Sequence, residues 1–381
     1  MHYNPVLYAR FHVIGFGTEE CERSIAKSAL NPSKKIWENY LLDLVGTQYT
    51  PLRSHTLQAI HLMVFVHKSI LPLITNVSSA AVACGLGNTL GNKGGVGISF
   101  RIANSRMLIL NTHLSAHQHK VEERNDQVWK ILNEMSTLLK MEEDKVDGND
   151  RKRDENKSGV KNIDLKSAQK EPVLDAGNSK DTDTELSAHN NTSDENDSKK
   201  DASTVKEISS TVADTTSSSG TTGTRGVDKI DKYYDCVIFM GDMNYRINGN
   251  RKVIDKLLDA NMHEVLMFND QLTVSFNQQK LPHFLIESPV TFRPTYKFDT
   301  GSDVYDTSAK QRIPSWTDRI LYTEPNMTCL TYNSVPDIRI SDHRPVYASF
   351  LAKIKVQKEH MMTNEKDTIA YSSESQVCTI M

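Results

Sequence analysis

Apolar positions recur along the chain with two different periods, and each period predicts a different kind of element. Across residues 119–139 the apolar side chains return every three or four positions, which places them on one face of a helix packed against a core. Short apolar runs elsewhere predict buried strands. We expect such strands at residues 58–66, 95–102, 107–112, 234–240, 319–322 and 346–351.

One long polar segment interrupts this pattern. No Phe, Tyr or Trp occurs between Trp129 and Tyr233, and residues 141–230 consist mainly of Asp, Glu, Lys, Asn, Ser and Thr. Such a stretch cannot bury enough apolar area to offset the entropy lost on ordering. The sequence therefore predicts a disordered insertion at 141–230. We expect it to divide a catalytic domain into residues 1–140 and 231–356, with a flexible tail at 357–381.

The insertion also hides a difference in charge. Residues 141–230 carry 14 Lys and Arg against 20 Asp and Glu, a net charge of −6, whereas the 381-residue chain carries −3, so the remainder carries +3. That charge is too small for the basic stripe of a nucleic-acid binder, but it suits an anionic small molecule or a membrane surface. No apolar run reaches the length of a membrane span, and the first residues lack a signal-peptide profile. We expect a cytoplasmic protein.

The candidate chemistry lies directly after or before the predicted strands. Asp242 and Asn244 follow one apolar run, His113 ends another, and Asp342 with His343 precedes the last. A carboxylate, an amide and imidazoles can position water and donate to a phosphate. Each cluster alone has a bland explanation as a strand-end turn or a structural histidine. Three such clusters at three strand ends favour a site.

A loop region adds phenol, ammonium and guanidinium donors. Residues 294–321 contain Tyr296, Lys297, Lys310 and Arg312 without a run of like charge, and Trp316 lies beside the start of an apolar strand. A plain solvated loop explains the lysines but not the tryptophan. Four donors suit a ligand that carries more than one phosphate.

These segments together resemble the magnesium-dependent inositol polyphosphate 5-phosphatases of the endonuclease/exonuclease/phosphatase superfamily. The segments occur in the family's order: GNKGGVGISF (91–100), NTHL, FMGDMNYR, PTYKF, Lys310-x-Arg312, PSWTDRIL and SDHRPV. GDxN and SDH are shared with nucleases of the superfamily, whereas GNKGGVG and PTYKF are specific to the inositol enzymes. The resemblance implies an α/β fold, a four-layer β-sandwich flanked by helices.

The resemblance also implies roles for the catalytic candidates. Asp242 is similar to the group that orients and deprotonates the attacking water, and Asn244 to the residue that holds water and phosphate. His113 and His343 resemble donors to the phosphate oxygens, and Asp318 the partner that orients His343. Asp342 would support the metal side or hold the adjoining loop.

Further roles concern the metal and the substrate. Glu20 resembles the ligand of Mg²⁺, and the scissile group is the 5-phosphate of the inositol ring. Tyr296, Lys297, Lys310 and Arg312 match the positions that bind the neighbouring 4-phosphate in the family. By the same resemblance, Asn92 and Lys93 lie near the phosphate site.

The sequence departs from the family before Glu20. The family opens with a strand carrying Thr-Trp-Asn, whose Asn contacts metal and phosphate, and that strand is missing here. Loss of a buried strand exposes apolar neighbours and unpaired backbone groups. Two explanations stay open: a truncated gene product, or a degenerate and weakly active member. Catalytic impairment of this chain is therefore one hypothesis.

The last four residues form a C-a-a-X pattern at Cys378, and a final Met favours farnesylation by a prenyltransferase. The bland alternative is a frayed terminus with a stray thiol. We expect a monomer attached to the membrane periphery and acting on phosphatidylinositol 4,5-bisphosphate. The alternative is a silent, membrane-anchored module that binds inositides. A nuclease of the same superfamily is disfavoured by the GNKGGVG and PTYKF segments and by the lack of a basic stripe, so we expect no nucleic-acid partner.

Overall fold

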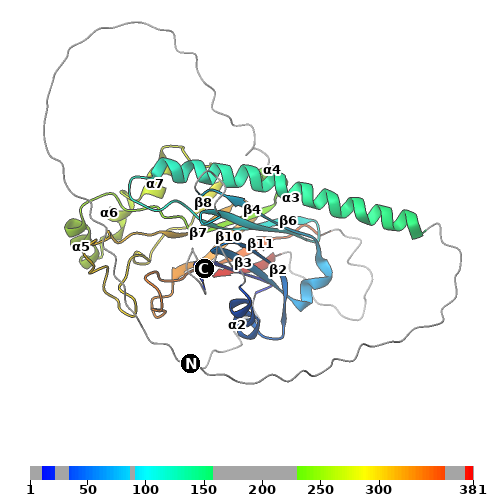
Figure 1. The fold of residues 1–381 in the computed structure, drawn as a ribbon, viewed down its shortest axis with the longest axis horizontal. Helices are drawn as coiled ribbons and strands as arrows, with labels where there is room; N and C mark the ends of the chain where they lie inside the picture. The colour runs from blue at the N-terminus through cyan, green and yellow to red at the C-terminus, as the bar shows by residue number, and fades with distance from the viewer. Residues whose placement is uncertain (1–10, 22–33, 86–90, 158–229, 357–373, 381) are drawn as a thin grey trace, which may run out of the picture. The chain divides into compact units, whose positions relative to one another are not determined.

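The computed structural model describes residues 11–21, 34–85, 91–157, 230–356 and 374–380. By the contacts between its residues the chain divides into two units, residues 1–155 with 223–381 and residues 156–222. The two β-sheets described below belong to the first unit (Figure 1).

Two six-stranded sheets form the body of the protein. Sheet A contains, in spatial order, β10 (Met327–Ser334), β11 (Val346–Lys353), β12 (Glu374–Ile380), β1 (Val13–Glu19), β3 (Ile60–His67) and β2 (Tyr49–Leu57). Sheet B contains β4 (Ile74–Ala83), β5 (Gly94–Ile102), β6 (Ser105–His113), β7 (Cys236–Asp242), β9 (Asp318–Thr323) and β8 (Leu285–Glu287). Among these paired neighbours, β1 with β12 and β6 with β7 are parallel, and the others are antiparallel.

Alternation of side chains along the strands explains why the sheets stack. Leu62 and Val64 of β3 pack into the core shared with sheet B, whereas Met63 and Phe65 pack on the opposite face against Leu41. Successive strand residues point to opposite faces, so an all-apolar strand such as β3 must be covered on both sides.

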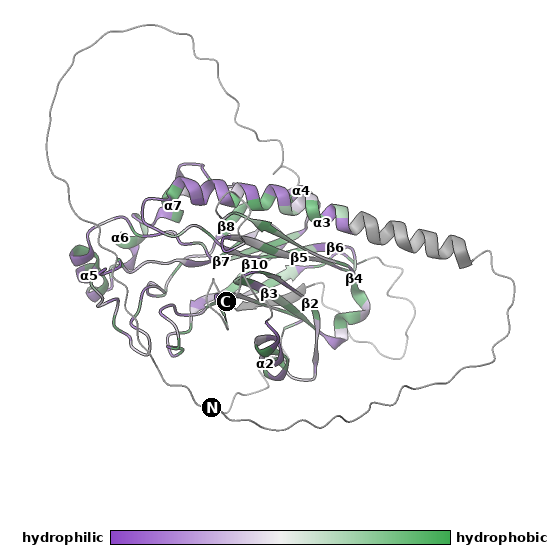
Figure 2. Ribbon diagram, in the orientation of Figure 1, coloured by the Kyte–Doolittle hydropathy of each residue, from purple (hydrophilic) through white to green (hydrophobic). Residues whose placement is uncertain are grey.

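Helices cover the outer faces. α2 (Lys35–Val45) packs against the outer face of sheet A, and the apolar stripe of α3 (Val121–Lys157) packs against sheet B. Figure 2 shows hydrophobic residues concentrated on the strands and polar residues on the surrounding helices and loops. The shorter helices are η2 (Lys68–Leu73), α4 (Ile230–Tyr233), α5 (Arg251–Asp259), α6 (His263–Met267) and α7 (Gln271–Asn277).

The predicted fold class is confirmed: helix, sheet, sheet and helix form four layers. Each predicted strand is present within about two residues of its predicted bounds, in line with the uncertainty of strand ends. The run 58–66 begins later as β3, because Gln58, with a φ of 50°, turns the chain tightly back from β2.

Two elements reach into segments that the sequence predicts to be without structure, and the predicted domain boundaries stay predictions. Helix α3 continues to Lys157, past the predicted boundary at 140, because Glu, Lys and Arg sustain a helix without an apolar stripe. The predicted insertion beyond it, 158–229, lies outside the described residues. The tail predicted as flexible contains β12, so residues 374–380 are a strand of sheet A. β12 pairs with β1 on one side and with β11 on the other.

Candidate active site

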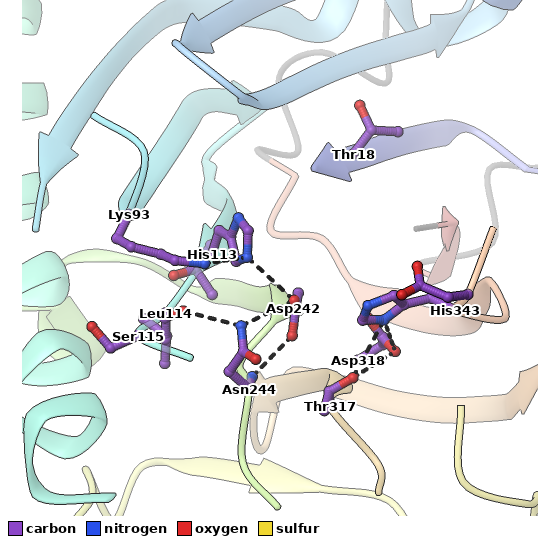
Figure 3. A network of polar contacts seen from close by, with 12 residues as sticks. Thr18, Lys93, His113, Leu114, Ser115, Asp242, Asn244, Thr317, Asp318 and His343 are labelled. Atoms are coloured by element: carbon purple, nitrogen blue, oxygen red, sulfur yellow. Dashed lines mark hydrogen bonds and ion pairs between the residues drawn. The ribbon is translucent and has the colours of Figure 1, made fainter. Parts of the chain in front are cut away.

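Three neighbouring strands of sheet B bring their polar residues to one place (Figure 3). β6 and β7 run parallel with His113 opposite Asp242, and β7 and β9 run antiparallel with Asp242 opposite Asp318. Gly241 permits the close approach of β6 and β7: its φ is 133°, and a Cβ there would lie 1.9 Å from the Thr112 carbonyl oxygen. The convergence predicted for these strand ends is present.

Asn244 donates two hydrogen bonds to the carboxylate of Asp242. The Asn244 backbone N–H donates to Asp242 Oδ1 at 3.0 Å, and its side-chain Nδ2 donates to Asp242 Oδ2 at 3.0 Å and to the Leu114 carbonyl at 3.1 Å. Both protons of the amide are therefore used. Asn244 holds Asp242 in this structure, whereas the sequence predicted that it holds water and phosphate.

Charge around Asp242 keeps it ionised. Burial alone would raise the pKa of its carboxyl group, but a hydrogen bond from His113 and the positive charges of His113, His343 and Lys93 bring that pKa below its ordinary value. His113 Nε2 lies 3.3 Å from Asp242 Oδ2 and also contacts Lys93 Nζ. Burial lowers the pKa of Lys93.

His343 is oriented by Asp318. Its Nδ1 lies 3.0 Å from Asp318 Oδ2, which also accepts hydrogen bonds from Thr295 Oγ1 at 2.6 Å and Thr317 Oγ1 at 3.0 Å. Burial alone would lower the pKa of the imidazole, but the charge of Asp318 and its hydrogen bond raise it to about 10. With Nδ1 bound to Asp318, Nε2 is the ring nitrogen left for a ligand.

Two glutamates at the end of β1 face this group. Glu20, the predicted metal ligand, lines the cavity but is exposed. Glu19 lines it too, and burial followed by the negative charges of Asp242 and Asp318 raises the pKa of Glu19 to about 8. Among the described residues, its buried Oε1 has no hydrogen-bond partner. Sequence reasoning missed Glu19.

These carboxylates fit a divalent cation. Asp242, Asp318 and His343 place possible ligand atoms within 4.8 Å of one another. A protonated imidazole has no lone pair for a metal, so the pKa of His343 points to the carboxylates instead. Glu19 and Asp242 have the oxygen chemistry that hard cations prefer, and among the described residues the buried Glu19 Oε1 has no hydrogen-bond partner.

A cavity of about 890 Å³ joins the candidates. The lining also contains apolar side chains, contributed by α2 and by Val335, Ile338, Ile340, Pro345 and Val346. The polar lining includes Glu19, Glu20, Lys93, His113, Asp242, Asn244, Arg246, Tyr296, Asp318, Asp342 and His343.

Of the four residues predicted to bind the 4-phosphate, Tyr296 lines the cavity. The Tyr296 ring lies 4.6 Å from the His343 ring and carries the Arg246 guanidinium at 4.3 Å. Lys297 Nζ pairs with Asp342 Oδ2 at 2.6 Å, so Asp342 holds the adjoining loop, one of its two predicted roles.

The remaining predicted donors lie at the edge of the site. Lys310 and Arg312 belong to a loop fastened by Asp306, whose Oδ2 accepts from the Arg312 backbone N–H at 2.6 Å, and neither side chain lines the main cavity. Asn92 lines a second cavity of about 740 Å³, which shares Lys93 with the first. Arg246 was missed as a site residue, although its place two positions after Asn244 is the signal that could have found it.

Comparison with known proteins shows which family this chain belongs to. Residues 4–349 match the model for "Endonuclease/Exonuclease/phosphatase family 2". Polyphosphatidylinositol phosphatase INP53 of Saccharomyces cerevisiae is 28% identical over 95% of this chain and 26% of its own length. Type II inositol 1,4,5-trisphosphate 5-phosphatase of Mus musculus is 26% identical over 85% of this chain and 25% of its own. The chain thus spans about a quarter of these relatives.

Two solved structures align with this chain over most of its length. The inositol polyphosphate 5-phosphatase domain of SPsynaptojanin, in complex with inositol (1,4)-bisphosphate and calcium ion, aligns with a TM-score of 0.60 at 25% identity over 97% of this chain and 76% of its own. A Cimex nitrophorin in a ferrous NO complex aligns with a TM-score of 0.55 at 21% identity over 89% of this chain and 86% of its own, which shows a shared fold alone.

Proposed function

Since this chain belongs to endonuclease/exonuclease/phosphatase family 2, we propose that it is a phosphoinositide 5-phosphatase acting on phosphatidylinositol 4,5-bisphosphate. The names of its relatives support this class of activity. The observation that carries the proposal is the convergence of Asp242, His113, His343 and Glu19 on one cavity. A silent inositide-binding module is not favoured, because it has no need for this arrangement.

The proposed reaction is an in-line attack by water on the 5-phosphate. The ionised Asp242 orients the attacking water and takes its proton, while Asn244 keeps the carboxylate in place. As the bond from water oxygen to phosphorus forms, the bond between phosphorus and the ring oxygen breaks, and the ring oxygen leaves as an alkoxide that takes up a proton. Protonated His343 donates from Nε2 to a phosphate oxygen that gains charge. Lys93 and His113 add donors on the other side of Asp242.

We propose Mg²⁺ as the cofactor, held by Glu19 and Asp242, with Glu20 as a further candidate. When bound, such an ion neutralises phosphate charge and stabilises the leaving alkoxide. The calcium ion in the synaptojanin complex supports a divalent cation in this family.

Apolar side chains beside the cavity support a lipid substrate over a soluble inositol phosphate. Tyr40 and Ile340 line the cavity and are 54% and 88% exposed. No helix among the described residues has the length and apolar character of a membrane span. We propose attachment of a cytoplasmic monomer through a prenyl group on Cys378, and Cys378→Ser should then move the protein from the membrane fraction to the cytosol. Unchanged fractionation argues against the anchor.

Phosphate release across a set of inositides tests the proposed activity. Vesicles with phosphatidylinositol 4,5-bisphosphate should give magnesium-dependent release, and phosphatidylinositol 4-phosphate should give none. Asp242→Ala serves as the blank, because it removes the carboxylate that orients the water. Equal release from both lipids, or full activity of Asp242→Ala, contradicts the proposal.

A further inference from the structure

The C-terminal strand β12 lies inside sheet A. On one side it pairs in parallel with β1, from Val13 opposite Val377 to Phe16 opposite Ile380. On the other side it pairs antiparallel with β11, from Tyr347 opposite Ile380 to Lys353 opposite Glu374. Its backbone therefore joins two hydrogen-bonded ladders at once.

Within the described part of the chain, β12 is the strand that joins the two halves of sheet A. The spatial order places β10 and β11 on one side of it and β1, β3 and β2 on the other. Neighbouring strands lie about 4.8 Å apart, so β1 and β11 flank a slot about 10 Å wide. An empty slot would leave two strand edges with unpaired N–H and C=O groups beside the core.

Each half of sheet A carries one side of the cavity. β1 ends in Glu19, and β11 begins three residues after His343. The His343 side is also fastened to the Tyr296 loop, where the Arg344 backbone N–H donates to the Thr295 carbonyl at 2.9 Å. The separation between Glu19 and His343 therefore depends on what fills the slot between β1 and β11.

We propose that the slot between β1 and β11 is a strand-acceptor site, that residues 374–380 are its occupant, and that their docking sets the spacing of the two sides of the catalytic cavity. The functional half of this inference rests on the proposed phosphatase activity, whereas the docking half does not. Cys378 pairs with Ile14 and Ser349 within both ladders.

Hydrogen exchange on the intact full-length chain tests the docking. Backbone amides of residues 374–380 should exchange at least a hundredfold more slowly than those of a free peptide ESQVCTIM. Exchange at the rate of the free peptide overturns the inference, whatever the enzymatic result. Protection that disappears on dilution together with a dimer assigns the strand to a second copy, which also overturns it.

Two substitutions test the coupling to the cavity. Val377→Pro removes a ladder N–H, and it should abolish the protection of residues 374–380 and lower phosphate release at least tenfold. Cys378→Ser keeps the backbone and should change neither. Unchanged release by Val377→Pro with protection lost removes the coupling and leaves the docking. A wild-type chain that releases no phosphate refutes the proposed function, and the exchange measurement still decides the docking.

Discussion

At the residue scale, Glu19 and Asp242 are two carboxyl groups of one cavity whose pKa values are displaced in opposite directions. Asp242 receives hydrogen bonds from Asn244 and lies among positive charges, which favours the ionised form. The carboxyl group of Glu19 is buried and faces the negative charge of Asp242, and among the described residues its Oε1 has no hydrogen-bond partner, which favours the protonated form. A divalent cation between the two carboxyl groups would favour the ionised form of Glu19.

Glu19→Gln tests this assignment. In the folded protein Glu19 has a pKa of about 8, above its ordinary value of 4.5, so its ionisation destabilises the metal-free protein increasingly from about pH 4.5 to 8. Without metal, Glu19→Gln should therefore melt at a higher temperature than wild type at pH 8 and at a similar temperature near pH 4.5.

Magnesium should raise the melting temperature of wild type at pH 8 and leave that of Glu19→Gln almost unchanged. Glu20→Gln is the matched control and should keep the response to magnesium. If Glu20→Gln alone loses that response, the metal belongs to Glu20, as the sequence predicted.

Gly241→Ala tests the contact that brings His113 beside Asp242. The new Cβ would overlap the Thr112 carbonyl oxygen, and the φ of 133° strains any residue other than glycine. We expect a loss of about 2–4 kcal/mol in the free energy of unfolding, measured by urea titration, together with lost phosphate release. Gly15→Ala is the control, since its Cβ would meet Ile109 at an ordinary 3.7 Å. Equal stability of the two variants would count against this explanation.

At the scale of elements, two consecutive residues of strand β9 point to opposite faces of sheet B and have different roles. Asp318 faces the cavity and holds His343, whereas Arg319 is fully buried with Asp270 and Glu287 at 2.9 and 2.5 Å. Tyr332 of β10 also donates to Glu287, so this network links the two sheets.

Arg319→Leu should destabilise the protein by about 3–5 kcal/mol, because it leaves two buried carboxylates without a counter-charge. Arg339→Leu is the control: its pair with Asp303 is exposed and screened by water, so its loss should have little effect on stability. Chemical denaturation at neutral pH measures both. A small effect of Arg319→Leu would contradict this role of Arg319.

The same scale shows what the sequence could predict. β3 and β7 are apolar throughout, and α3 begins with a clear stripe, so their patterns identify them. β2 contains Pro51 and mixed polarity along a sheet edge, and β12 contains polar residues and pairs with strands far away in the sequence. Local pattern carries no signal for such strands, because distant partners decide their pairing.

The site was predictable to a similar degree. Motif spacing identified Asp242, His113 and His343, and the ends of neighbouring strands bring them together. The choice between Glu19 and Glu20 depends on the last residue of β1, and strand ends are the least predictable positions. The engagement of Lys297 by Asp342 depends on the fold of a loop, which spacing does not reveal.

At the scale of the whole molecule, two stacked sheets carry a cavity lined by both polar and apolar side chains. A nitrophorin shares this fold, so the layers alone do not specify phosphatase chemistry. The proposed catalytic activity rests on the side chains at the strand ends, and the proposed preference for a lipid substrate rests on the exposed apolar residues beside them.

Ile340→Ser should lower phosphate release from vesicles by roughly tenfold, since about 1.5 kcal/mol of apolar contact with lipid is lost. Release from soluble inositol 1,4,5-trisphosphate should stay unchanged. Leu330→Ser is the control, because Leu330 is 51% exposed but does not line the cavity. Equal losses on both substrates would place Ile340 in the reaction itself.

The direction of β12 has a practical consequence for anyone who labels this protein. Because β12 runs parallel to β1, its last residue, Ile380, lies toward the end of the sheet where β1 reaches Glu19. A fluorescent reporter or affinity handle fused behind it would emerge from an interior strand next to the cavity, and it would also cover the residues proposed for prenylation. Imaging and purification are therefore better served by a fusion at the opposite terminus.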